Sequence, residues 1–181
     1  EFSSDYWGMV ANIPSVLHWR LETARHEEVY RWHRRILQTM QHGAPRKRWL
    51  LKSPGHLMYL PTIFARYPGV RVIHTHRDPL KTMPSTASIT STVRWMRSDH
   101  VDRATLAQEI VFGFQFVMDG VIDMRAQGVL PEAQFADSHF LDLMEDPVGN
   151  IRRLYEQLDL AFTESFAADI LRYLREKPKD K

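Results

Sequence analysis

The hydrophobic residues of this chain recur mostly at helical spacing. Between His26 and Gln41 an apolar residue returns every three or four positions, which predicts an amphipathic helix that Gly43 ends. The same spacing predicts a helix over 57–67 and a long one from about 103 to 127. The apolar stripe of the first helix consists of Val29, Trp32, Ile36, Leu37 and Met40.

Two more helices are predicted near the C-terminus, each behind a residue type that favours the N-cap. Asp146 precedes an apolar stripe at Ile151, Leu154 and Leu158, and Thr163 precedes a second stripe. Both stripes have one apolar side, so we expect each helix to pack on a neighbouring element.

Short apolar runs between the helices predict strands. One covers Trp49–Leu51 and another Val70–Thr75, and the helix between them is short enough for a parallel crossover. Strands that alternate with helices predict the α/β fold class, as a three-layer sandwich with a mostly parallel sheet. We expect residues 1–181 to form a single domain, because the chain has no linker, repeat or low-complexity tract.

Composition narrows the function classes. A formal net charge of +2 is too small to indicate nucleic acid as a partner. The absence of cysteine excludes disulfides and thiolate metal sites and fits a cytoplasmic protein. The longest apolar run, Ile110–Ile122, is interrupted by Gln115 and Asp119, so we expect no membrane span.

Side chains that could bind an anionic ligand follow the first two predicted strands. Each apolar run breaks at a proline into cationic and hydroxyl side chains, in Leu50–His56 and in Val72–Pro79. A parallel strand ends in this way where its carboxyl tip binds an anionic ligand. Arg77 supplies a guanidinium that suits phosphate oxygens, and Ser85 follows eight residues later in a predicted helix.

These residues resemble the sulfotransferases that use 3'-phosphoadenosine 5'-phosphosulfate (PAPS). In that family an Arg at a strand tip and a Ser eight residues later bind the 3'-phosphate, which implies this cofactor-binding role for Arg77 and Ser85. The segment Lys52–His56 is similar to the family's Lys and catalytic His, and it implies that His56 is the general base and Lys52 an electrostatic helper. The run Phe135–Pro147 is similar to the family's third strand and the acidic-Pro helix start after it.

The resemblance implies PAPS-dependent transfer of a sulfuryl group to a hydroxyl acceptor on a small molecule, glycan or lipid, with PAP as product and without a metal. The family's Gly/Ser/Thr-rich phosphosulfate loop has no counterpart among the scattered glycines. We therefore expect this chain to be an interior portion of a longer P-loop-like sulfotransferase, and to be inactive by itself because that loop binds the 5'-phosphosulfate.

Other functions stay open at this point. A small-molecule or nucleoside kinase of related architecture would need a carboxylate for magnesium, and Asp78 is the close candidate. A non-catalytic domain that binds PAP is a further alternative. His74 and His76 point to the same side of one strand, as metal ligands do, but the sequence shows no obvious carboxylate to complete a site. The tryptophans that we consider for an acceptor pocket are Trp7, Trp19, Trp32 and Trp95.

Overall fold

The computed structural model describes residues 10–23, 26–44 and 48–177. The chain divides into two compact units, each made of two separate stretches of sequence. The helical unit comprises Glu1–Gly69 and Leu80–Leu130, and the strand unit comprises Val70–Pro79 and Pro131–Lys181.

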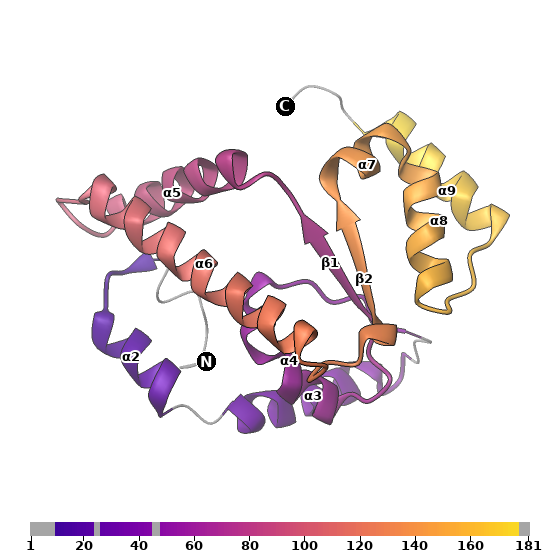
Figure 1. Cartoon of the computed structure of the whole chain (residues 1–181), viewed down its shortest axis with the longest axis horizontal. Coiled ribbons are helices and arrows are strands. Elements are labelled where there is room, and N and C mark those ends of the chain that lie inside the picture. The colour runs from indigo at the N-terminus through magenta and orange to yellow at the C-terminus, as the bar shows by residue number, and fades with distance from the viewer. Residues whose placement is uncertain (1–9, 24–25, 45–47, 178–181) are drawn as a thin grey trace. The chain divides into compact units, whose positions relative to one another are not determined.

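Helices joined by turns and irregular segments make up the described part of the helical unit (Figure 1). Helix α3 contacts α4, and the 3₁₀ helix η1 contacts both α4 and α6. The elements are α2 (Pro14–Glu22), α3 (His26–Gln41), η1 (Pro54–Tyr59), α4 (Leu60–Arg66), α5 (Pro79–Trp95) and α6 (Arg103–Ala126).

Helix α3 forms with the predicted bounds, but it turns a different face inward. Tyr30 is buried and His33 is half-buried, whereas Trp32 and Ile36 of the apolar stripe are more than half exposed. The inner face is aromatic because its rings pack against η1: His26 stacks on Tyr59 with ring centroids 4.0 Å apart. Trp32 and Met40, which we expected in the core or a pocket wall, are therefore on the exposed side of α3.

The predicted strand at Trp49–Leu51 is absent. Residues 48–53 have no strand hydrogen bonds in the described part of the chain, and the side chain of Leu50 is 93% exposed. A strand requires a neighbouring backbone to complete its ladder, and no described segment pairs with this one. The segment nevertheless ends as predicted, because Ser53 has extended backbone and Pro54 begins η1.

Helix α6 matches the predicted long helix. Asp102 caps it, because its carboxylate accepts hydrogen bonds from the backbone N–H groups of Ala104 and Thr105. Leu106 and Val121 are buried on its inner side. By length and composition α6 could cross a membrane, with a mean hydropathy of 1.2 over 18 residues. One such helix is weak evidence for a span, because core helices of globular proteins meet the same criteria.

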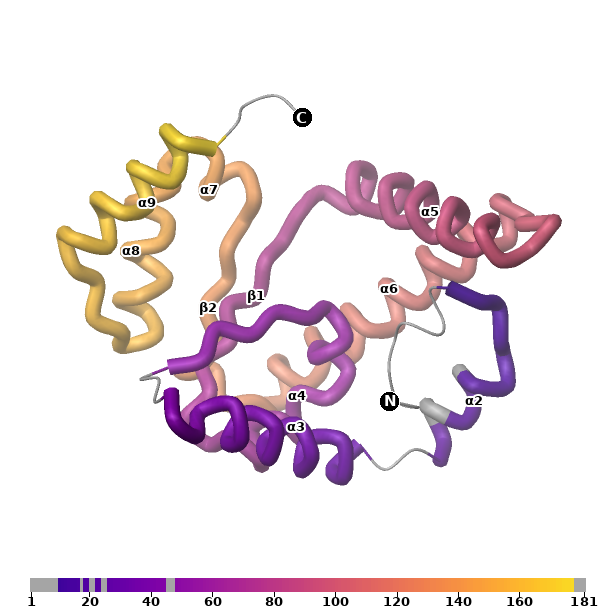
Figure 2. The backbone as a smooth tube through the Cα atoms, turned by 180° about the vertical axis from the view of Figure 1, so that it is seen from behind, coloured from indigo at the N-terminus to yellow at the C-terminus, as the bar shows by residue number. Residues whose placement is uncertain are grey.

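The strand unit contains a parallel pair of strands. Strand β1 (Val72–His76) pairs with β2 (Phe135–His139), and His74 lies opposite Asp137 in the register. Helices α7 (Phe140–Glu145), α8 (Pro147–Gln157) and α9 (Glu164–Glu176) follow β2 along the chain. Figure 2 shows α8 and α9 beside each other, with α8 next to β2. The structure is thus α/β and rich in helix with a small parallel sheet, and the three-layer sandwich stays a prediction.

Helix α8 covers one face of this sheet. Ala136 of β2 packs against Leu154 and Leu158, and all three side chains are buried. On the same face the Ser138 hydroxyl donates a hydrogen bond to the Asn150 side-chain oxygen at 3.2 Å.

The two predicted N-caps of this unit are confirmed. Asp146 accepts from the Gly149 N–H at 2.8 Å, and Thr163 accepts from the Phe166 N–H at 3.2 Å. A Cβ at position 149 would lie 1.9 Å from an Asp146 carboxylate oxygen, so a larger residue there would displace the capping carboxylate.

We expect Leu158→Ala to destabilise the chain by about 2–5 kcal/mol, because it leaves a cavity against Ala136 and Leu154. Leu158 is 1% exposed. The matched control is Leu141→Ala, since Leu141 is 77% exposed and loses little burial. Urea unfolding followed by circular dichroism measures both variants. Equal destabilisation of the two would contradict this placement of the core.

Candidate active site

His56 lies in η1, where the sequence puts a proline at the first helical position. The backbone N–H of His56 donates to the Ser53 carbonyl at 3.4 Å, which begins the turn. Its ring is half-buried, and Nδ1 is hydrogen-bonded to the Tyr30 hydroxyl of α3 at 2.9 Å. A hydrogen bond at one ring nitrogen fixes the orientation of the imidazole, as a general base requires.

A second imidazole–phenol pair lies beside His56. His33 Nδ1 and the Tyr67 hydroxyl are hydrogen-bonded at 2.7 Å, and the rings of His33 and His56 meet edge-on with centroids 6.2 Å apart. Burial, and to a smaller extent the nearby His56, lowers the pKa of His33 below its usual 6.5. Burial likewise raises the pKa of the Tyr67 hydroxyl. Both groups are therefore neutral near pH 7.

The lowered pKa of His33 predicts that the chain loses stability as pH falls below about 6.5. In that range the unfolded chain binds more protons at this position than the folded chain, so the free energy of unfolding decreases with falling pH. His33→Gln removes this loss. The free energy of unfolding of the parent should therefore decrease relative to that of the variant between pH 7.5 and 5. Urea unfolding at several pH values, with the exposed His42→Gln as control, measures it. Parallel curves for parent and His33→Gln would contradict the shifted pKa.

Lys52 and Ser85, the other predicted residues of the helical unit, are exposed to solvent. Lys52 lies in the segment 48–53 that leads into η1, four residues before His56. Ser85 lies inside α5, directly after Pro84 within the helix. The roles given to both residues stay predictions.

Arg77 lies one residue beyond β1, at the carboxyl edge of the parallel pair. Its guanidinium carbon is 4.4 Å from the ring centre of Phe140, the residue that follows β2. This cation–π contact holds an exposed Arg at the edge where parallel sheets bind ligands. Arg77 belongs to the strand unit and Ser85 to the helical unit, so their joint phosphate clamp also stays a prediction.

A cluster that sequence reasoning described only in part lies on the sheet beside Arg77. Asp137 Oδ1 is 2.7 Å from His76 Nε2 and 3.8 Å from His74 Nδ1. The sequence reasoning found both histidines but no carboxylate, because Asp137 is 61 residues away from His76 in the chain. Only the pairing of β1 with β2 brings them together.

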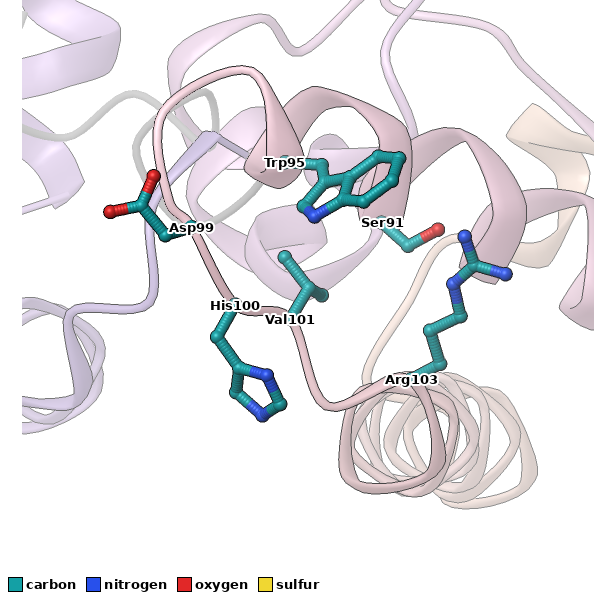
Figure 3. Close-up of a pocket in the computed structure, with 6 residues that line it drawn as sticks. All are labelled: Ser91, Trp95, Asp99, His100, Val101 and Arg103. Atoms are coloured by element: carbon teal, nitrogen blue, oxygen red, sulfur yellow. The ribbon is translucent and has the colours of Figure 1, made fainter.

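A small pocket lies where α5 ends and α6 begins (Figure 3). Its volume is ≈ 240 Å³, below the roughly 300–1,000 Å³ of typical ligand pockets, so it is too small for a nucleotide. Trp95 is in its lining, whereas Trp19 and Trp32 are exposed elsewhere and Trp7 lies outside the described residues. The lining residues are Ser91, Trp95, Asp99, His100, Val101 and Arg103.

Sequence reasoning missed the partners that position the predicted residues. Tyr30 and His33 were given no role from the sequence, although their i, i+3 spacing places them on one helix face. Phe140 carried no signal, since its contact with Arg77 depends on the strand pairing.

Comparison with known proteins decides the family. The model described as "Sulfotransferase family" matches residues 10–164, which include Lys52, His56, Arg77 and Ser85. The chain belongs to the sulfotransferase family. It is 25% identical over 162 residues to the omega-hydroxy-beta-dihydromenaquinone-9 sulfotransferase Stf3 of Mycobacterium bovis and to that of Mycobacterium tuberculosis, covering 85% of this chain.

Solved structures of sulfotransferases have the same fold. Sulfotransferase STF9 from Mycobacterium avium superposes with a TM-score of 0.87 over 99% of this chain at 23% identity. Sulfotransferase STF1 from Mycobacterium tuberculosis H37Rv superposes with a TM-score of 0.77 over 90% of the chain at 28% identity. This sulfotransferase chain spans 40% of the length of the curated relatives and 45% and 44% of the two solved chains.

Proposed function

We propose that the full-length protein transfers a sulfuryl group from PAPS to a hydroxyl group of a small-molecule or lipid acceptor. The observation that carries the proposal is the hydrogen bond between Tyr30 and His56, which orients an imidazole in the family-matched region. The curated relatives act on an omega-hydroxy menaquinone derivative, by their names, and this supports a lipid-like hydroxyl acceptor.

The residues of this chain fit the parts of PAPS that they would contact. When bound, PAPS supplies the activated sulfuryl group, and its phosphates are anions. Arg77 is exposed at a strand tip and can donate N–H groups to a phosphate from its position over Phe140. Ser85 would add a hydroxyl donor to the 3'-phosphate.

His56 would take the proton of the acceptor hydroxyl as that oxygen forms its bond to sulfur. Tyr30 keeps the His56 ring in place during this transfer, because the Tyr30 hydroxyl is hydrogen-bonded to Nδ1 of that ring. The exposed ammonium group of Lys52 would offset the negative charge that develops on the leaving phosphate. The proposed transfer uses no metal ion.

The test is the transfer of labelled sulfuryl groups from PAPS by the full-length protein. We expect a labelled product with hydroxylated isoprenoid quinones or other hydroxyl-bearing lipids and none with the same compounds lacking the hydroxyl. Phosphoryl transfer from ATP in a parallel assay would instead favour the kinase alternative, for which the carboxylate of Asp78 is exposed. PAP binding with no transfer to any acceptor would favour the non-catalytic alternative. A cytoplasmic location remains part of this proposal.

A further inference from the structure

Three side chains that commonly bind metals converge on one face of the β1–β2 pair. Ligating atoms of His74, His76 and Asp137 all lie within 4.8 Å of one another. Asp137 Oδ1 lies closest to His76 Nε2, at 2.7 Å, and it is 3.8 Å from His74 Nδ1.

The convergence follows from strand geometry. Alternate residues of a strand point to the same face, so His74 and His76 share one side of β1. The parallel register puts Asp137 opposite His74. The other face of β2 carries Ala136 and Ser138, which α8 covers. The cluster therefore lies on the face opposite α8.

The donor set indicates the class of ion. Two imidazoles with one carboxylate suit Zn²⁺ and related divalent transition metals, whereas Mg²⁺ and Ca²⁺ prefer oxygen ligands alone. Tetrahedral Zn²⁺ with bonds of 2.0–2.1 Å sets its ligand atoms about 3.3 Å apart. The distances of 2.7 and 3.8 Å lie on either side of that spacing, so side-chain rotation can supply the difference. We propose that His74, His76 and Asp137 form a binding site for a divalent metal ion of the Zn²⁺ class.

The surroundings suit such a site. His74 is 7% exposed, while His76 and Asp137 are about 30% exposed, so an ion can enter from one side and meet a ligand held by the packed sheet. The ring of His139 stacks on that of His76 with centroids 5.0 Å apart and steadies it. A bound ion would join the carboxyl ends of both strands and place positive charge one residue from Arg77. The site uses residues of the strand unit alone and does not depend on the proposed sulfuryl transfer.

The experiment is a Co²⁺ titration of the chelator-treated chain, read by visible absorption and followed by displacement with Zn²⁺. We expect saturable one-to-one binding with the intense bands of four-coordinate Co²⁺ and their loss on addition of Zn²⁺. Asp137→Asn and His76→Gln should each weaken binding at least about tenfold, because each removes a ligand. The matched control is His42→Gln, an exposed histidine in the helical unit, and it should bind as the parent does.

A thermal melt provides a second measurement. Saturating Zn²⁺ should raise the melting temperature of the parent and of His42→Gln but not that of Asp137→Asn, since an ion that binds only the folded chain stabilises it. Circular dichroism checks that the variants are folded. Failure of the parent to bind Co²⁺, or equal binding by the parent and folded Asp137→Asn, would overturn the proposal and leave a hydrogen-bonded His–Asp cluster.

Discussion

Turnover of the full-length protein is expected to fall about 10²–10⁴-fold in His56→Ala, with little change in its affinity for PAP. The reason is that a general base acts on the acceptor proton in the transition state and does not contact the nucleotide product. Steady-state sulfuryl transfer measures turnover, and calorimetric titration with PAP measures the affinity.

Tyr30→Phe tests the orientation of the His56 ring separately from its role as general base. This variant removes the hydroxyl bonded to His56 Nδ1 but keeps the buried ring, so we expect a smaller loss of turnover than in His56→Ala. The same substitution at Tyr173, which is 62% exposed in α9, is the control and should leave turnover unchanged. Near-parental turnover in His56→Ala would mean that the base is another residue.

The second large effect is expected at Arg77, where alanine should weaken PAP binding at least tenfold. Charge-assisted bonds from a guanidinium to a phosphate contribute about 1.5–3 kcal/mol, which corresponds to that factor or more. Adenosine 5'-phosphosulfate lacks the 3'-phosphate, so its affinity should hardly change in the same variant. Calorimetric titration of both nucleotides makes the comparison.

Two variants accompany Arg77→Ala. Ser85→Ala should weaken PAP binding by less, because a neutral hydroxyl donates a weaker bond than a guanidinium. Arg153→Ala removes an exposed Arg of α8 and should bind PAP as the parent does, which controls for the loss of one charge. Equal losses for PAP and adenosine 5'-phosphosulfate in Arg77→Ala would show that Arg77 does not bind the 3'-phosphate.

Local signals in the sequence predicted the strand unit well. The apolar run before Arg77 became β1, and it has the pairing partner β2 that a strand requires. Asp146 and Thr163 became N-caps, because a cap depends only on residues a few positions away. The resemblance to a family indicated β2, and the structure confirms a strand at Phe135–His139.

The features that failed depend on distant partners. Trp49–Leu51 has the composition of a strand but pairs with no described segment, so it remains without ladder bonds. The inward face of α3 is set by rings on η1, which made Tyr30 and His33 inner residues in place of Trp32. The position of Asp137 beside His76 required the register of two strands, which no short stretch of sequence encodes.

The pairing of β1 with β2 has a consequence for synthesis of the chain. The 58 residues 77–134 separate the two strands, so β1 leaves the ribosome long before its partner exists. At about 5–20 residues per second this interval lasts about 3–12 s, which is long compared with hydrophobic collapse. During that time the nascent chain carries a strand whose β2-facing edge is unpaired, and such edges invite association with other chains. The hydrogen bonds that pair this edge form only after translation has passed His139. The strand unit therefore folds late, and a chaperone that covers the unpaired strand would act during this interval.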